Sequence, residues 1–184
     1  MNPSCNLFLI GPTGAGKTSV GRRLAAHYDL AFSDLDHEIE RHTGTDVATV
    51  FAVEGEAGFR RRESALLAEL SAGEGVLLVT GAGAVLDADN RALLATRGCV
   101  LWLQVDIEQQ LHRLAHDTKR PLLAGVDRRA RLEAMAAIRE PLYRETADLV
   151  LPATHGITAI CTQAIVLIDR HWQRHSLPTP SPAA

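Results

Sequence analysis

Short apolar runs alternate with segments of helical periodicity along most of this chain. The apolar runs predict five strands, which lie at 5–10 (CNLFLI), 31–36 (AFSDLD), 76–80 (VLLVT), 99–105 (CVLWLQV) and 149–151 (LVL). The segments between and after them predict helices at 20–30, 46–70, 89–96, 107–114, 128–143 and 157–172. The second of these helices is expected to break near Gly55 and Gly58.

This alternation predicts an α/β fold with three layers, α/β/α, around a five-stranded parallel sheet. The strands are apolar almost throughout, which is typical of strands covered on both faces. Ligands of such sheets bind beyond the carboxyl ends of the strands. We expect one domain over 1–172, followed by a Pro- and Ser-rich tail over 173–184 that stays disordered.

Composition excludes several classes of partner. A net charge of −3 provides no basic field for nucleic acid, and aromatic residues make up only 4% of the chain. No apolar segment approaches the roughly 20 residues that span a membrane, and the first residues do not resemble a signal peptide. The three separated cysteines favour buried thiols in a reducing cytoplasm: Cys5, Cys99 and Cys161. We therefore expect a cytoplasmic protein without nucleic-acid or membrane partners.

The stretch GPTGAGKT, at 11–18, carries the strongest chemical signal. It matches the phosphate-binding loop G-x-x-x-x-G-K-[ST] and stands between a predicted strand and a predicted helix. Backbone N–H groups of such a loop surround phosphate oxygens, here those of Gly14, Ala15, Gly16 and the first helical residues up to Ser19. Lys17 is expected to reach the β- and γ-phosphates of ATP, and Thr18 to bind Mg²⁺.

Two acids, Asp34 and Asp36, end the second predicted strand. Residues two apart on a strand share one face, so both carboxylates are expected in one crevice. One carboxylate would support Mg²⁺ through water, and the other would accept a proton from an attacking hydroxyl. Alternatively, the DLD stretch only caps the next helix, EIERHTG (38–44), with Asp as its N-cap. Position alone does not choose between these interpretations.

Three arginines in other segments of the chain are further candidates for the site. Arg60 and Glu63 are spaced to share one helical face. Arg120 lies in an aperiodic segment, 115–125, which predicts a lid that closes over the reactants. Arg139 stands two residues before Pro141, which is expected to kink or end its helix.

Together these motifs resemble the shikimate kinases, from about residue 6 to about residue 170. The resemblance rests on order and spacing: GPTGAGKT, DLD, GEAGFRRRE (55–63), VTGAGAV (79–85), RPLL (120–123) and REPLYRETAD (139–148). Members of this family have the P-loop kinase fold and phosphorylate the 3-hydroxyl of shikimate with MgATP, on the route to chorismate and the aromatic amino acids.

The resemblance implies a role for each residue on the acceptor side. Arg60 and Arg139 would bind the shikimate carboxylate, because a guanidinium matches a carboxylate bidentately. Asp36 would accept hydrogen bonds from ring hydroxyls and take the proton during attack. Glu63 would orient Arg60, and the segment Gly81, Ala82 and Gly83 would line the substrate pocket.

On the nucleotide side, Thr18 would bind Mg²⁺ directly and Asp34 through water. Arg120 would join Lys17 in stabilising charge on the transferred phosphoryl group. The loop 152–157 (PATHGI) lacks the arginine or glutamine that contacts adenine in many members. Arg113 is the other candidate for stacking on the base.

Ala82 is a second departure, since the family has glycine there. Alanine keeps the backbone N–H but makes a positive φ costly. The departure leaves open a kinase for another small acceptor, such as gluconate or a nucleoside monophosphate. A non-catalytic nucleotide-binding module is the alternative outside enzymes.

Two further features favour simpler interpretations. His112 and His116 have helical i, i+4 spacing, but no third ligand points to zinc. Trp102 lies in a buried-strand pattern and is expected in the core. We also expect the protein to act on small-molecule substrates and to be a monomer.

Overall fold

Five strands form one parallel sheet, as the sequence predicts. The structure is a computed structural model that describes residues 6–115 and 127–175. The sheet order is β2-β3-β1-β4-β5, and every neighbouring pair is parallel. The strands are β1 (Asn6–Ile10), β2 (Ala31–Asp34), β3 (Val76–Val79), β4 (Gly98–Gln104) and β5 (Leu149–Pro152).

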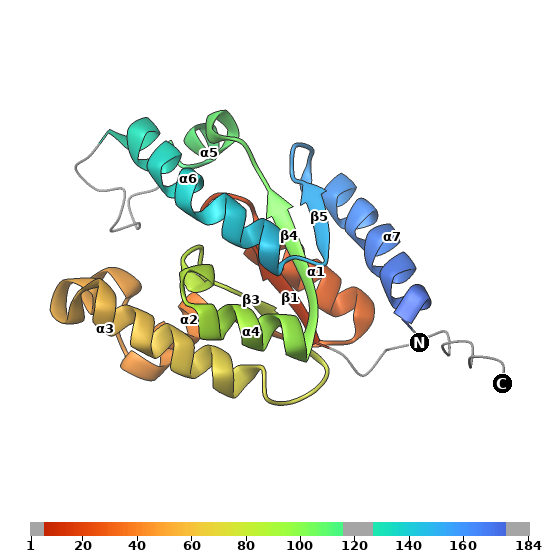
Figure 1. Ribbon diagram of the computed structural model, residues 1–184, viewed down its shortest axis with the longest axis horizontal. Helices are drawn as coiled ribbons and strands as arrows, with labels where there is room; N and C mark the ends of the chain where they lie inside the picture. The colour runs from red at the N-terminus through yellow and green to blue at the C-terminus, as the bar shows by residue number, and fades with distance from the viewer. Residues whose placement is uncertain (1–5, 116–126, 176–184) are drawn as a thin grey trace, which may run out of the picture.

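Helices cover both faces of this sheet (Figure 1). On one face lie α1 (Lys17–Tyr28) and α7 (Ile157–His175). The other face is covered by α2 (Leu35–Thr43), α3 (Val47–Leu70), α4 (Ala88–Arg97) and α6 (Arg128–Thr146). The short α5 (Ile107–Arg113) packs against α6, and a 3₁₀ turn, η1 (Ala84–Leu86), follows β3. The predicted three-layer α/β/α architecture is thus confirmed.

Alternation along the strands divides the core into two layers. Leu7 and Leu9 of β1 pack toward α1 and α7, whereas Phe8 and Ile10 pack toward α3 and α4. This alternation follows from the two-residue period of a strand. Trp102 is 1% exposed and belongs to the second layer, as expected. Because both layers are apolar, the polar groups of the site are left to the loops at the strand ends.

Several boundaries differ from the sequence-based expectation, most of them by one to three residues. Strand β2 ends at Asp34, so Asp36 lies in the first turn of α2 rather than on a strand. Helix α6 continues past Pro141 to Thr146, because Tyr143 anchors the helix in the core beyond the proline. Helix α7 reaches His175, three residues beyond the predicted end.

The predicted break in α3 is real and occurs at Gly55. Its backbone angles, φ 69° and ψ 177°, are open to glycine but strained for other residues. Gly58 remains in regular helix. The side chain of Glu54 folds across the break and accepts hydrogen bonds from Arg62, at 2.7–3.0 Å. The second half of α3 carries Arg60 and Glu63 against the segment after β3.

Within the described ranges 6–115 and 127–175, no helix combines the length and apolarity needed to cross a membrane.

Candidate active site

The phosphate-binding loop leaves β1 at Gly11 and enters α1 at Gly16. A Cβ on Gly11 would lie 2.5 Å from the carbonyl oxygen of Leu103, so only glycine fits where the loop passes β4. Gly14 and Gly16 have φ of 79° and 87°, in the left-handed region that favours glycine. Gly16 is also the N-cap of α1 and offers no side chain as a cap. The first amides of α1, up to Ser19, are therefore available to an anion.

Lys17 lies back against the loop that precedes it. Its Nζ donates hydrogen bonds to the carbonyl oxygens of Gly11 and Pro12, at 2.8 and 3.0 Å. Ala15 N–H closes the turn on the Pro12 carbonyl at 3.3 Å. The ammonium group is thus held at the phosphate-binding loop.

Thr18 and Asp34 meet across the start of the two helices. Thr18 Oγ1 donates to Asp34 Oδ2 at 2.6 Å, and Asp34 is only 6% exposed. Asp34 Oδ1 accepts from the backbone N–H of Asp36 at 3.2 Å and so caps α2. Asp34 therefore caps α2, as the second interpretation of DLD predicts, and it also faces the phosphate-binding loop through Thr18. A hydroxyl beside a carboxylate is an oxygen donor set that suits Mg²⁺.

Asp36 does not share a strand face with Asp34, contrary to the prediction. It sits in the first turn of α2, half-buried, and its carboxylate faces Gly81 and Glu63. The helical turn separates the two acids, so each serves a different part of the site. Asp34 turns to the phosphate-binding loop, and Asp36 turns to the segment after β3.

Arg60 and Glu63 form an ion pair on α3, as the i, i+3 spacing predicts. Arg60 Nη1 donates to Glu63 Oε2, and Glu63 is 0% exposed. Arg60 also lies 3.4 Å from Glu56. Burial raises the pKa of the Glu63 carboxyl above its usual 4.5, and Asp36 adds to this, while Arg60 opposes it. The pair holds the Arg60 guanidinium in one place.

The segment Gly81, Ala82 and Gly83 packs directly on this pair. A Cβ on Gly81 would lie 2.2 Å from Glu63 Oε1, and a Cβ on Gly83 would lie 2.2 Å from Arg60 Nη2. Glycine is needed here for close packing and not for a left-handed backbone, since Gly83 has φ −103°. The strain expected at Ala82 is absent, because Asp29 is the one non-glycine residue with positive φ in the described ranges.

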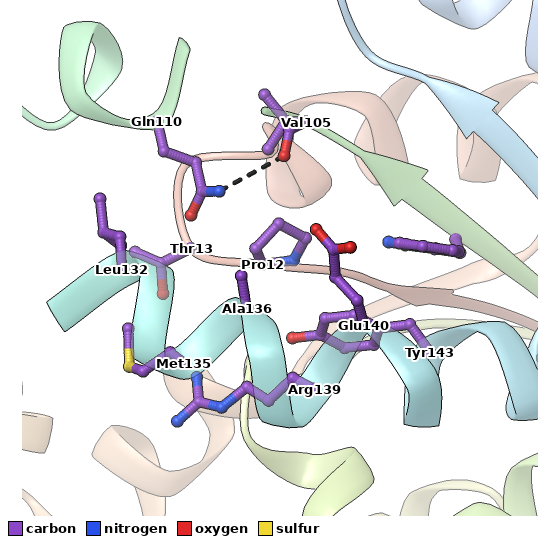
Figure 2. A pocket seen from close by; sticks show the side chains of 11 residues that line it. Pro12, Thr13, Val105, Gln110, Leu132, Met135, Ala136, Arg139, Glu140 and Tyr143 are labelled. Atoms are coloured by element: carbon purple, nitrogen blue, oxygen red, sulfur yellow. Dashed lines mark hydrogen bonds between the residues drawn. The ribbon is translucent and has the colours of Figure 1, made fainter. Parts of the chain in front are cut away.

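Arg139 approaches the same cluster from α6. It is 8% exposed and hydrogen bonds to Tyr143, whose hydroxyl donates to the Ala82 carbonyl at 2.5 Å. Figure 2 shows the α6 side chains Arg139 and Tyr143 lining a pocket together with Pro12 and Thr13 of the phosphate-binding loop. The phosphate-binding and acceptor parts of the site are therefore adjacent.

Arg60 and Arg139 lie close enough together for the charge of one to act on the other. Burial lowers the pKa of Arg139, and the neighbouring Arg60 lowers it further, while Tyr143, Glu56 and Glu63 oppose the change. A bound anion would stabilise the charge of the buried Arg139 beside the half-buried Arg60. The arrangement suits a small acidic molecule with hydroxyl groups, because the Asp36 carboxylate can accept hydrogen bonds from those hydroxyl groups.

Arg113 connects the phosphate-binding loop to the loop after β5. Its Nη1 donates to the Gly14 carbonyl at 3.0 Å, and its Nη2 donates to the Ala153 carbonyl at 2.6 Å. Arg113 is a candidate for stacking on adenine, and the structure places it against the loop 152–157. The bridge itself has no signal in the sequence.

Two predicted features lie outside the described residues. These are Arg120, with most of the lid at 115–125, and His116 of the weak zinc pair. Sequence reasoning also missed one functional candidate, Tyr143. Its helical spacing from Arg139, four residues on, is the signal that could have found it.

The comparisons with known proteins agree with this geometry. The family model for shikimate kinase matches residues 13–169. The chain belongs to the shikimate kinase family. The shikimate kinase of Stenotrophomonas maltophilia is 50% identical over 178 residues, which cover 96% of this chain and 99% of that protein.

Solved structures give the same result and also show how widely the fold is shared. A shikimate kinase from Acinetobacter baumannii in complex with shikimate has a TM-score of 0.89 at 40% identity, covering 96% of this chain and 97% of that one. A gluconokinase from Sinorhizobium meliloti is similar at a TM-score of 0.57 and 14% identity, over 95% and 98% of the two chains. At that identity the second likeness shows the fold alone.

Proposed function

We propose that this protein transfers the γ-phosphoryl group of ATP to the 3-hydroxyl of shikimate, giving shikimate 3-phosphate and ADP. Membership of the kinase family makes ATP the phosphoryl donor. The observation that carries the choice of acceptor is the meeting of Arg60, Arg139 and Asp36 beside the phosphate-binding loop. Shikimate combines a carboxylate for the arginines with ring hydroxyls for the aspartate.

Each acceptor residue has a distinct task in this proposal. Arg60 and Arg139 bind the carboxylate through charge-assisted hydrogen bonds, and Glu63 keeps Arg60 oriented. Asp36 orients the attacking hydroxyl and accepts its proton. Gly81 and Gly83 let the Arg60–Glu63 pair approach the backbone, and the amide of Ala82 would face the substrate.

The nucleotide side positions the phosphates. Amides of Gly14, Ala15, Gly16 and Ser19 bind the β-phosphate region, and Lys17 exchanges its loop carbonyls for phosphate oxygens. Mg²⁺, held by Thr18 and through water by Asp34, would neutralise phosphate charge. Arg120 and the lid 115–125 would close over the reactants and exclude water. Arg113 would border the adenine at the 152–157 loop.

A coupled assay of ADP release tests the proposal. We expect release with shikimate that depends on Mg²⁺, and background release with gluconate or AMP. Gluconate tests the alternative of a gluconate kinase, an activity found in a protein of the same fold. AMP tests the alternative of a nucleoside monophosphate acceptor. Release with another acceptor but not with shikimate would refute the proposed substrate. No release with any acceptor, together with normal ATP binding, would favour the non-catalytic module.

We further propose a monomeric, cytoplasmic enzyme that acts on small molecules, with no nucleic-acid or membrane partner. Its kinase domain would span 1–172, followed by the tail 173–184. Light scattering coupled to size exclusion tests the oligomeric state. A mass equal to two chains would refute the monomer.

A further inference from the structure

Three side chains that can bind metal lie together at the amino-terminal edge of the sheet, opposite the phosphate-binding loop. They are Cys99 near the start of β4, Asp148 just before β5, and His171 near the end of α7. One ligand atom from each, the Cys99 Sγ, a carboxylate oxygen and an imidazole nitrogen, lies within 4.8 Å of the other two. None of these residues belongs to the proposed active site.

The topology of the sheet brings the three together. Strands β4 and β5 are parallel neighbours, and Leu101 pairs with Leu149, which places Asp148 beside Val100 at the strand starts. Helix α7 follows β5 and runs back along the sheet, so its last turns lie over the same edge (Figure 1). Cys99 points to the α7 face, where it shares a core cluster with Ile168. Residues from three elements therefore meet at one point.

We propose that Cys99, Asp148 and His171 bind Zn²⁺ through Sγ, a carboxylate oxygen and an imidazole nitrogen. Zinc favours tetrahedral sites built from Cys, His and Asp, with bonds of about 2.0–2.3 Å. Such bonds separate the ligand atoms by roughly 3–4 Å. Side-chain rotations of about an ångström would close the cluster to that geometry. Water would be the fourth ligand.

Two observations around the cluster support a bound ion. The Asp148 carboxylate is already oriented, because its Oδ2 accepts from the backbone N–H of Val100 at 2.8 Å. Such outer hydrogen bonds fix the direction of a metal ligand and strengthen its binding. The cluster also borders a hollow of about 570 Å³ that reaches solvent and is lined in part by Glu74 and Gly98. The hollow gives the ion a path in and leaves room for the water ligand.

The site would connect β4, the start of β5 and α7 without touching the reacting groups. A metal ion that binds the folded chain but not the unfolded chain stabilises the folded state by mass action. We therefore expect zinc to raise the melting temperature of the wild-type protein and to leave its turnover unchanged.

Cobalt titration of untagged wild-type protein tests the proposal directly, with Mg²⁺ in excess to occupy the phosphate site. We expect the thiolate-to-Co²⁺ charge-transfer band, together with the visible spectrum of a tetrahedral ion, and displacement of both by Zn²⁺. Affinities for Zn²⁺ are then compared by competition with a chromophoric chelator. Cys99→Ala should abolish the charge-transfer band. Asp148→Asn and His171→Gln should weaken Zn²⁺ binding by at least about tenfold, as loss of an oriented ligand group does.

Cys161→Ala is the matched control, because Cys161 is also buried on the α7 side but lies outside the cluster. It should keep the wild-type spectrum and affinity. Absence of the charge-transfer band from the folded wild-type protein would overturn the proposal, and this readout needs no variant to fold. Wild-type affinity in Asp148→Asn would overturn it too, since the exposed Asp148 tolerates this change in a folded chain, as circular dichroism would verify.

Discussion

Single residues in the site are fixed by what lies against them. Gly83 illustrates this, because the Arg60 guanidinium occupies the space that a Cβ would need. The obstructing atoms are the far end of a flexible side chain, which can move at little cost in stability. An added methyl group would therefore displace the arginine while leaving the fold intact.

We predict that Gly83→Ala raises the KM for shikimate by roughly 10- to 100-fold and hardly changes the KM for ATP. The estimate is the loss of one charge-assisted hydrogen bond, about 1.5–3 kcal/mol. Steady-state kinetics with each substrate varied in turn would measure it. Gly73→Ala is the control, since a Cβ there meets nothing within 4 Å. An equal rise for both substrates would contradict the steric explanation.

Asp36 carries the proton transfer in the proposed reaction. We predict that Asp36→Asn binds ATP normally and loses about 10²–10⁴-fold in turnover, the usual contribution of a positioned base. The amide keeps the size of the side chain but cannot accept the proton. Nucleotide titration and single-turnover kinetics separate binding from chemistry. Near-normal turnover would remove Asp36 from the mechanism.

Among the helices, the kink in α3 has the clearest energetic basis. Gly55 adopts a backbone conformation that essentially only glycine tolerates, and the kink directs Arg60 toward Gly83. Glu54 and Arg62 join the two halves of the helix across the break.

We predict that Gly55→Ala lowers the free energy of unfolding by about 1–3 kcal/mol, the cost of such a strained residue. It should also raise the KM for shikimate, because relief of the strain straightens α3 and moves Arg60. Urea unfolding and kinetics would measure the two effects. Gly75→Ala provides the comparison, since Gly75 also has positive φ (73°) but lies before β3. It should lose stability and keep the shikimate KM. Unchanged stability of Gly55→Ala would refute the argument.

Helices and strands were predictable from the sequence wherever a single pattern of apolar residues dominated. The five strands and the Gly55 break followed from apolar runs and glycine, which reflect local preferences. The continuation of α6 through Pro141 was not predictable, because tertiary packing of Tyr143 overrides the local signal. Asp36 was assigned to a strand because a helix that starts directly after a strand leaves no loop to mark the change.

Within the site, motifs predicted which residues meet but not how they meet. The Arg60–Glu63 pair followed from helical spacing. The close packing that requires glycine at 81 and 83 was not predictable, since steric closeness between distant segments has no local pattern. The Arg113 bridge to Ala153 was invisible for the same reason.

For the whole molecule, the buried Glu63 links stability to pH. Its pKa in the folded protein is raised, mainly by burial, so the folded state holds this proton more tightly than the unfolded state. Stability from Glu63 is therefore fully present below the usual pKa of 4.5 and is lost as pH rises through the raised value.

We predict that the difference in unfolding free energy between Glu63→Gln and the wild-type protein increases with pH above 4.5, in favour of the variant. Glutamine removes the titration while keeping the shape of the side chain. Urea unfolding of both proteins at matched pH values measures the difference. A difference that stays constant across this range would contradict the assignment.

The position of β1 in the sheet has a consequence for synthesis of the chain. This strand carries the phosphate-binding loop, yet both of its partners, β3 and β4, come much later in the sequence. During translation β1 emerges before the other strands and has no strand partner until β3 has left the ribosome, and its second partner, β4, follows later. Gly11 also needs Leu103 of β4 as its packing surface. Nucleotide therefore cannot assist early folding of the nascent chain, and the apolar β1 segment is exposed to chaperones during that interval.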